Sequence, residues 1–556
     1  MTLRRLRQKM GDAIRALEAQ QVPVLKPGED RYRKSIATSN LVFRFCRPDC
    51  VVQPQSVAHV QAIVREAKAR SLKLTIKGNG HSYAGHSTAM SGISLDLRSM
   101  KTAQLDMNPV DPMVTMDAGC QWGDVYEKLI IGGHDRYIIN GGRCPTVGVS
   151  GFILGGGLGP FTRSFGMGAD TLAEATLVTA DGSLVTVSES DPPSSSKGRL
   201  FWALRGAGGG NFGIVVQMKL RVKKLANPRG MVVAGRYQWF PNDGITDDLV
   251  ATMNTFYATP WPNKMTIDTT WICDLRDNSN TGGVRFNISF DGTKFEYNNI
   301  IKRYVAHPEL QRQLKRRALP EPSTRYLYET LVSQWLEETQ RAYPTNKTYE
   351  LYSSFVFDNS SPSALADITA AIRTLMTQFR VDFKGEKVNF LVTWIHSGGE
   401  ASRKVPNETA YFWRQAVFHT YVTIEWVDKW MEEDMRDFLA SVKQKLRPLS
   451  LNAEAAFVNF PDRDFPGKTH ERAYWGDNKE ELRQVKKMWD PEGFFNWTQG
   501  VRRPEDPDED EAWGEENQTD KLASEQWGKW SKTTEPVDLA EEFNDLGDLG
   551  FDEDEE

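Results

Sequence analysis

The sequence predicts an α+β protein, and three features of the chain carry that prediction. Short strands and helices alternate from Cys50 onward. Three glycine-rich clusters follow one another between residues 77 and 213. Residues 226–455 then mix strand-like runs with long helices, which is typical of an antiparallel sheet that is covered by helices on one side.

The composition allows a large buried core and indicates several domains. The chain has 556 residues, of which 40% are hydrophobic and 26% are charged, and this length is typical of two or three domains. The net charge of -6 is uneven, because residues 503–556 hold 21 acidic and 4 basic side chains. We expect that segment to be a solvated, disordered tail. The remaining body is only mildly basic and has no basic arm, so no nucleic-acid partner is predicted.

The sequence shows no sign of a membrane span, a signal peptide or a metal centre. No run approaches the ~20 apolar residues that cross a bilayer, and the basic N-terminus lacks the apolar stretch of a signal peptide. We therefore expect an intracellular protein, with secretion as the alternative. Cys46 and Cys50 could pair if the chain matures in an oxidising compartment. No zinc-type spacing of Cys and His is present, so no metal is predicted.

The N-terminal region is expected to begin with a helix and to continue into a strand, a helix and a second strand. Residues 1–35 form a helix and a loop in this prediction, because apolar residues recur at helical spacing. A strand at 50–54 ends at a proline, and Ser56 is a good N-cap for the next helix. Residues 72–76 alternate between apolar and polar side chains, which predicts a half-buried strand before the first glycine loop.

The glycine clusters at 77–83, 141–168 and 205–213 indicate that the backbone approaches a ligand closely. Each glycine within regular structure costs roughly 0.5–1 kcal/mol relative to alanine, so such a density needs a reason. Loops of this kind expose backbone N–H groups that can bind a pyrophosphate. The spacing fits neither the nicotinamide fingerprint nor a P-loop. The clusters favour a dinucleotide or phosphate ligand over ordinary turns.

The region 226–455 is expected to form the antiparallel sheet together with helices at 363–379 and 427–446. The predicted strands are 231–239, 264–275, 284–290, 351–357, 388–394 and 417–426. In the last of these, period-two alternation places His419, Tyr421 and Glu425 on one face. That face is either the wall of a pocket or a sheet face that is open to solvent.

Seven motifs taken together resemble one enzyme family. They are Gly78–Tyr83, Gly142–Val149, Gly155–Gly159, Phe201–Val215, Phe457–Asp462, Tyr474–Asn478 and Lys486–Phe495. The combination resembles the FAD-linked oxidoreductases of the berberine-bridge-enzyme-like family, within the vanillyl-alcohol-oxidase superfamily. The resemblance spans residues 30–502 and suggests a fungal tailoring enzyme of secondary metabolism.

The resemblance implies a PCMH-type FAD-binding fold of two α+β subdomains, with an α/β substrate domain that is built on an antiparallel sheet. It divides the chain into an N-terminal helix and loop, an FAD-binding domain, a substrate domain, a C-terminal segment that returns to the FAD domain, and the acidic tail. The expected bounds are, in that order, 1–35, 36–225, 226–454, 455–502 and 503–556.

The resemblance also implies that FAD is held by two covalent bonds. His81 matches the family's histidine at the 8α-methyl group of the flavin, and Cys144 matches its cysteine at C6. Val147 matches a position beside the flavin where members that use O2 carry valine. The cofactor-binding residues implied by the motifs are Gly78, Asn79, Gly80, His81, Ser82, Cys144, Thr146, Val147, Gly148, Gly151, Gly155, Gly156, Gly157, Gly159, Asn211, Gly213, Ile214, Val215, Tyr474 and Asn478.

One motif departs from the family pattern. Many oxidases of the family carry Tyr-x-Asn-Tyr, whose second tyrosine serves in proton abstraction, whereas this chain has Phe460 at that position. Phenylalanine has no hydroxyl and cannot act as an acid or a base. The candidate replacements are Tyr83, which matches an active-site tyrosine of the family, and the strand residues His419, Tyr421 and Glu425. His419 is favoured among the strand residues because an unperturbed imidazole titrates at about 6.5.

The sequence therefore predicts an FAD-dependent oxidase that acts on a small, apolar or aromatic metabolite in a biosynthetic pathway. Hydride would pass from the substrate to a covalently bound flavin, and O2 would be the final electron acceptor. The alternative is an oxidative or redox-neutral cyclase on the same scaffold, and the missing tyrosine at Phe460 motivates it. The substrate and the oligomeric state stay open.

Overall fold

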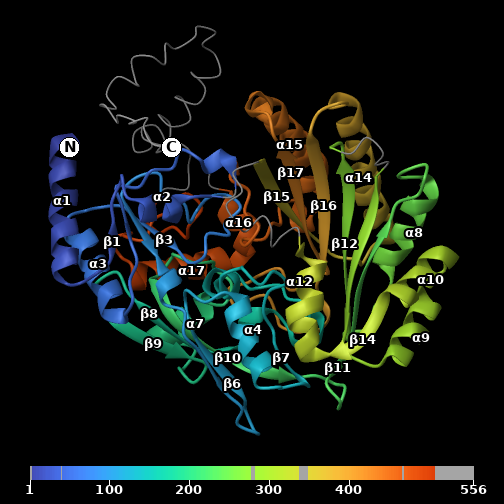
Figure 1. Cartoon of the computed structure of the whole chain (residues 1–556), viewed down its shortest axis with the longest axis horizontal. Coiled ribbons are helices and arrows are strands. Elements are labelled where there is room, and N and C mark those ends of the chain that lie inside the picture. The colour runs from blue at the N-terminus through green and yellow to red at the C-terminus, as the bar shows by residue number, and fades with distance from the viewer. Residues whose placement is uncertain (1–2, 39, 277–281, 337–347, 466–468, 507–556) are drawn as a thin grey trace, which may run out of the picture. The chain divides into compact units, whose positions relative to one another are not determined.

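Three β-sheets organise the described part of the chain (Figure 1). The computed structural model describes residues 3–38, 40–276, 282–336, 348–465 and 469–506. All but four residues of the predicted acidic tail lie outside these ranges, so the expectation of a disordered tail stays a prediction. No helix within the described ranges combines the length and the apolar character that a membrane span requires.

The first sheet is small and carries the loop that holds His81. Its elements and the helices around it are α1 Leu3–Ala19, β1 Val24–Leu25, α2 Asp30–Ile36, β2 Cys50–Val52, α3 Val57–Ala69, β3 Leu74–Lys77 and β4 Ile93–Asp96. The strand order is β1-β2-β4-β3, and β4 pairs in parallel with both β2 and β3. Helices α1 and α3 share one apolar cluster with this sheet. Ser56 caps α3 by accepting the His59 N–H, which confirms that prediction.

The second sheet is antiparallel and supports the other two glycine clusters. Its strands are β5 Ala103–Asp106, β6 Met113–Asp117, β7 Tyr137–Ile139, β8 Leu172–Val178, β9 Leu184–Ser188 and β10 Ile214–Lys224. The strand order is β5-β6-β10-β8-β9, and β7 also pairs with β10. The helices on this half are α4 Trp122–Ile131, α5 Val149–Leu154, α6 Thr162–Phe165, α7 Ser196–Ala203, α16 His470–Trp475 and α17 Lys479–Trp489. These two sheets and their helices are called the flavin lobe below, after the FAD that the family resemblance implies.

The third sheet has seven antiparallel strands in the order β14-β11-β13-β12-β16-β17-β15. Their bounds are β11 Met231–Trp239, β12 Met265–Asp274, β13 Gly283–Phe290, β14 Ala318–Pro322, β15 Tyr349–Phe357, β16 Val388–His396 and β17 Phe418–Trp426. All six predicted strands are present, and the antiparallel sheet is confirmed. Strand β14 escaped prediction because its two prolines are typical of loops, and they are tolerated here because the strand lies at the sheet edge.

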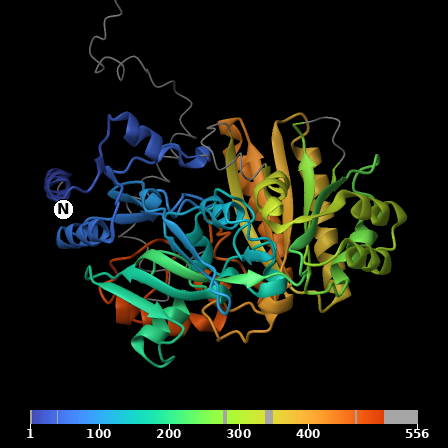
Figure 2. The same cartoon turned by 60° about the horizontal axis from the view of Figure 1, so that its bottom comes forward.

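Helices cover one face of this seven-stranded sheet (Figures 1 and 2). They are α8 Asp247–Ala258, α9 Lys294–Tyr304, α10 Pro308–Arg317, α14 Pro362–Asp382 and α15 Glu432–Leu446, while the short α11 Ser323–Arg325 and α12 Leu331–Gln334 follow β14. The predicted helix at 427–446 begins later than expected, because a 3₁₀ turn at Lys429–Met431 precedes α15.

The two faces of β17 match the predicted alternation. Phe418, Val422 and Trp426 pack with the helices in one apolar cluster, whereas Tyr421 packs with residues of the flavin lobe in another. Every residue of β17 is buried. The interpretation of the polar face as open to solvent is therefore wrong, because the flavin lobe covers that face.

The suggested pairing of Cys46 with Cys50 is also wrong, since both cysteines are free. Cys46 packs into the apolar cluster of the seven-stranded sheet. Cys50 lies within β2 and packs into the cluster of the first sheet. The two thiols point into different cores, so their closeness in sequence does not bring them together.

Candidate active site

The three glycine clusters converge in the flavin lobe. Asn79, in the first cluster, donates through its side chain to the carbonyls of Gly119 (3.1 Å) and Cys120 (3.2 Å). The Cys120 carbonyl also accepts the N–H of Val149, in the second cluster, at 3.0 Å. Gly206 and Gly208, in the third cluster, both donate to the Leu154 carbonyl at the end of α5, at 3.0 and 2.8 Å. These hydrogen bonds join loops that are far apart in sequence into one wall.

The glycines of this wall divide into packing positions and open positions. A Cβ on Gly159 would lie 2.2 Å from the Gly141 carbonyl oxygen, and one on Gly155 would lie 2.0 Å from Asn459 Oδ1. Nothing lies within 4 Å of a Cβ built on Gly151, which is exposed. Gly80 is also exposed and has a φ of +81°, which favours glycine. A Cβ on Gly80 would lie 3.0 Å from Lys77 Cε, so only Gly151 of these two has open space beside it. The exposed backbone at Gly80 and Gly151 fits a cofactor that lies against the main chain.

His81 and Cys144 approach the same hydroxyl group. The Thr146 Oγ1 lies 3.4 Å from His81 Nε2 and 3.2 Å from Cys144 Sγ. Burial lowers the pKa of His81 to about 4, so the imidazole is neutral at neutral pH and has a free electron pair on one nitrogen. A neutral imidazole and a thiol therefore lie close together, each within 3.4 Å of one hydroxyl oxygen.

The side chains of three other residues that were predicted to bind the cofactor make hydrogen bonds within the protein. The Asn211 side-chain amide donates to Ala207 O and Gly208 O, and its oxygen accepts the Trp497 and Val501 N–H groups. The Tyr474 hydroxyl donates to Gln499 Oε1 at 2.7 Å. The Asn478 amide donates to three carbonyls of the loop at 406–410. Any contact of Asn211 with a cofactor therefore comes from its backbone.

A cavity of about 130 Å³ adjoins the His81 loop. The residues that line it include His81 and Tyr83, the segment 34–38, and two side chains of the seven-stranded sheet, Glu350 and Tyr352. The Tyr352 hydroxyl donates to the Glu350 carboxylate. Sequence reasoning missed both residues, although β15 alternates in the same way as β17 and its polar side chains share the polar face.

Aromatic rings gather where this cavity meets the sheet. The ring centroids of Tyr83 and Tyr352 lie 4.1 Å apart, and those of Tyr421 and Phe460 lie 4.6 Å apart. Tyr83 lies 6.1 Å from Tyr421 and 5.7 Å from Phe460. The structure thus brings the predicted residues Tyr83 and Tyr421 together around Phe460 and adds Tyr352 as a third phenol.

His419 is unsuited to the role of general base that was expected of it. Its Nδ1 lies 2.7 Å from Ser397 Oγ, and its Nε2 contacts the Tyr411 hydroxyl. Burial, with smaller contributions from Arg143 and Arg414, lowers its pKa to about 3. The expectation of an ordinary imidazole pKa is therefore wrong, because the flavin lobe removes this side chain from water.

Glu425 lies at the opposite end of β17 from His419. At about 3.3 Å per residue the two positions are ~20 Å apart along the strand, so they cannot serve one reacting atom. The Glu425 carboxylate accepts a hydrogen bond from Asn389 at 3.1 Å and lies 3.5 Å from the Arg276 guanidinium. The four predicted catalytic residues therefore do not form a single cluster, and Tyr83 and Tyr421 are the two that the structure unites.

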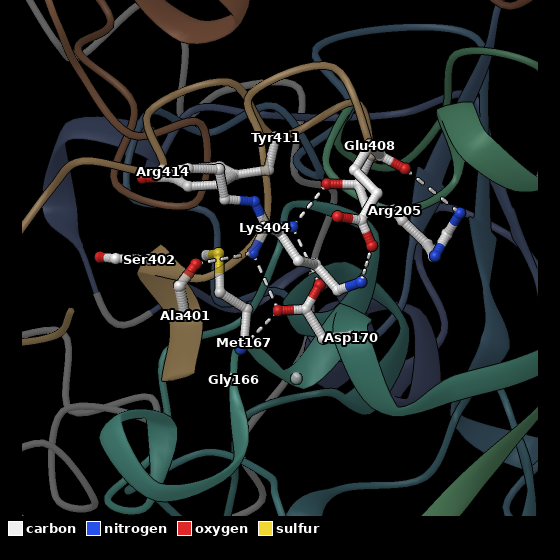
Figure 3. A network of polar contacts seen from close by, with 12 residues as sticks. Gly166, Met167, Asp170, Arg205, Ala401, Ser402, Lys404, Glu408, Tyr411 and Arg414 are labelled. Carbon is white, nitrogen blue, oxygen red and sulfur yellow. Dashed lines mark hydrogen bonds and ion pairs between the residues drawn. The ribbon is translucent and has the colours of Figure 1, made fainter. Parts of the chain in front are cut away.

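Two buried ion pairs connect the flavin lobe to the region of the seven-stranded sheet. Arg414 binds Asp170 through two hydrogen bonds of 2.8 and 2.9 Å, and its guanidinium lies 5.3 Å from the Tyr411 ring centre (Figure 3). Arg143, which directly precedes Cys144, binds Asp268 of β12 at 2.5 and 3.0 Å. Both pairs are almost completely buried, so they fix how the sheet faces the glycine wall.

Comparison with known proteins agrees with this arrangement. Residues 48–188 match an FAD binding domain, and residues 456–502 match the berberine and berberine-like family. The chain is 26% identical over 471 residues to the FAD-linked oxidoreductase ZEB1 of Gibberella zeae, a match that covers 81% of this chain and 75% of the relative. It is 39% identical over 176 residues to aurantioclavine synthase cnsA of Penicillium expansum, a match that covers 30% of this chain and 36% of the relative.

Among solved structures, the chain is similar to berberine bridge enzyme in complex with (S)-reticuline, with a TM-score of 0.73 and 19% identity. That likeness covers 88% of this chain and 99% of the other and shows the shared fold. The match to an FAD binding domain and the FAD-linked relatives show an FAD-binding oxidoreductase, and the glycine wall fits that class. Over residues 48–188 and 456–502, and along most of its length in the match to ZEB1, the chain is similar to the FAD-linked oxidoreductases of the berberine-bridge-enzyme-like family.

Proposed function

We propose that this enzyme is an oxidase that carries FAD attached covalently at His81 and Cys144. The observation that supports it is the placement of both side chains on one hydroxyl, Thr146 Oγ1, at 3.4 and 3.2 Å. When bound there, the flavin supplies the acceptor for a hydride from the substrate. The protein supplies the neutral imidazole, the thiol and the exposed backbone at Gly80 and Gly151.

We propose O2 as the final electron acceptor. Val147 supports this through its place between the two attachment residues and α4. Its N–H donates to the Cys144 carbonyl at 3.2 Å, and its carbonyl accepts the Trp122 N–H at 3.1 Å. These bonds hold a compact aliphatic side chain beside the attachment loop, where the family resemblance implies access for O2.

The proposed substrate is a small aromatic metabolite of a biosynthetic pathway. The rings of Tyr83, Tyr352, Tyr421 and Phe460 support this, because aromatic walls favour apolar ring systems through stacking and burial. A cyclase that closes a ring with or without net oxidation is the second candidate. Phe460 favours it, since this chain lacks the hydroxyl that serves the sugar and alcohol oxidases of the family.

Denaturation tests the attachment. Acid-denatured wild-type protein should retain its flavin, and so should the single variants His81→Ala and Cys144→Ala, through the bond that remains. The double variant should release all of its flavin. Release of all flavin by the wild-type chain would contradict bicovalent attachment.

Anaerobic mixing tests the reaction class. The probes are (S)-reticuline, tryptophol, vanillyl alcohol and glucose, each added to the holoenzyme while the visible flavin absorbance is recorded. An oxidase should lose that absorbance with an aromatic probe and regain it when air is admitted. Formation of a cyclised product without any loss of absorbance would favour the redox-neutral cyclase.

A further inference from the structure

We propose that Tyr352 is the catalytic residue that takes the substrate's proton, and that Glu350 is the positioning residue that receives the phenolic proton in turn. This inference rests on the proposed oxidase function. In the family resemblance, proton abstraction belongs to a tyrosine that is replaced here by Phe460. The inference assigns that role to a tyrosine of β15. The observations that carry it are a hydrogen bond, a shared cavity and a ring contact.

The pair lies where a substrate would meet the flavin loop. Glu350 and Tyr352 line the same cavity as His81 and Tyr83. The Tyr352 ring lies 4.1 Å from the Tyr83 ring, and Tyr83 follows His81 by two residues. Both side chains of the pair are buried, with 6% exposure each, so the hydroxyl works in a setting that is largely shielded from water.

The backbone of Glu350 is held on both sides by one residue. Asn40 donates through its amide to the Glu350 carbonyl at 2.9 Å, and its side-chain oxygen accepts the Glu350 N–H at 3.1 Å. Thr348 donates its hydroxyl to Glu350 Oε1 at 3.3 Å. Strand β15 is also paired with β17 along its whole length. The carboxylate is therefore fixed before any substrate arrives, which is what efficient proton transfer needs.

The chemistry balances without a further reagent. A substrate hydroxyl or amine gives its proton to the Tyr352 oxygen while the Tyr352 proton moves to the Glu350 carboxylate. As a C=O or C=N bond forms in the product, the carbon–hydrogen electron pair leaves as hydride, for which bound FAD would be the acceptor. O2 would finally take up these two electrons together with two protons to give H2O2, and the proton on Glu350 returns to solvent. An unperturbed phenol titrates near about 10, so it needs such an acceptor to act near neutral pH.

The charged and titratable groups around the pair come from several elements. The cavity is also lined by the cations Lys34, Lys77 and Arg98. Glu425 is the cross-strand neighbour of Glu350. Glu350 must be ionised to accept a proton, so the rate of flavin reduction should fall on acidification.

The test uses Tyr352→Phe and Glu350→Gln in the holoenzyme, with Tyr349→Phe as the matched control. Tyr349 lies on the same strand but on the helix-covered face, where it packs on Trp426. The probe is whichever of (S)-reticuline, tryptophol or vanillyl alcohol bleaches the wild-type flavin fastest. Stopped-flow reduction is followed from pH 5 to pH 9, together with flavin content and Tm.

Tyr352→Phe should slow flavin reduction by roughly 10²–10⁴-fold, which is the usual contribution of general-base help. Glu350→Gln keeps a hydrogen-bond acceptor for Tyr352 but cannot take its proton, so it should slow reduction and abolish the fall at low pH. Tyr349→Phe should behave as wild type. Flavin content should be the same in all four proteins.

Wild-type rates in Tyr352→Phe, or an unchanged pH profile in Glu350→Gln, would overturn the inference while leaving the oxidase proposal intact. If one variant does not fold, the other decides the question alone. Absence of bleaching by every probe in wild type would instead overturn the proposed function, and the inference would fall with it.

Discussion

The two faces of the seven-stranded sheet are made by the same strands but meet different neighbours. On one face, Phe390, Phe418 and Ile424 are buried under helices, where apolar side chains need only fill space. On the other, Glu350 and His419 are buried against the flavin lobe, where a polar group that lacks a partner costs about 1–3 kcal/mol. The polar face is therefore stabilised through specific pairs, and those pairs also position the proposed site.

The largest expected effect comes from breaking one of these pairs. Asp268→Asn leaves the buried Arg143 guanidinium without its ionic partner, and loss of one member of such a pair costs about 3–5 kcal/mol. Because Arg143 precedes Cys144 and also donates to the Leu158 carbonyl at 2.5 Å, the proposed flavin bond at Cys144 should fail to form in most chains. Urea unfolding measures the stability, and alkylation of Cys144 after denaturation measures the attachment.

Asp170→Asn is the matched control for this prediction. It breaks the Arg414 pair, which is equally buried and also joins the two halves, but which does not involve the Cys144 loop (Figure 3). It should cost a similar amount of stability and leave Cys144 attached. Equal loss of attachment in both variants would mean that attachment follows overall stability, not the placement of Arg143.

The sequence predicted the elements of the polar face better than their partners. Alternation in 417–426 placed Tyr421 correctly because alternation is local to one strand. Glu350 lies just outside the predicted strand at 351–357. Its position on the polar face follows from the register of β15 with β17, which cannot be predicted from the local sequence pattern of either strand. The pair of Arg143 with Asp268 likewise joins distant segments through the packing of two lobes.

Residue type alone also could not predict the roles of individual glycines or the pKa of His419. Gly151 and Gly159 belong to one cluster, yet one has open space beside it and the other packs on the Gly141 carbonyl. His419 was given an ordinary imidazole pKa because its burial depends on the flavin lobe and on arginines that are remote in sequence. Local patterns thus predicted which side chains lie on which face of a strand. The tertiary contacts determined which of these side chains are buried, paired or open to a ligand.

An intermediate effect should follow from His419 when the pH is lowered. Its pKa is about 3 in the folded protein and about 6.5 in an unfolded chain. Between these values the unfolded state binds more protons, so the stability is fully present above pH ~6.5 and is lost as the pH falls toward 3. At pH 5 the loss is about 2 kcal/mol.

His419→Gln removes this titration. Between pH 7.5 and pH 5, the free energy of unfolding of the variant should therefore fall by about 2 kcal/mol less than that of the wild-type protein. Urea unfolding of both proteins at the two pH values measures the difference. Parallel pH dependences would show that His419 is accessible to protons in the folded state, which would contradict the complete burial of the polar face.

The smallest expected effect compares two threonines that lie on opposite faces of the sheet. Thr420 faces the helices opposite Phe355 and Trp394, and its buried hydroxyl has no hydrogen-bond partner among the described residues. Thr393 lies on the polar face and shares a hydrogen bond of 3.2 Å with Thr270. Thr420→Val should raise the free energy of unfolding by about 1 kcal/mol, because it removes an unpaired polar group. Thr393→Val should lower it by about 1 kcal/mol, because it removes a buried hydrogen bond, although Thr270 keeps its hydrogen bond from Arg285 at 3.4 Å. Urea unfolding of both variants measures the two changes in the free energy of unfolding. A loss of stability in Thr420→Val would show that the helix-covered face also depends on polar pairing.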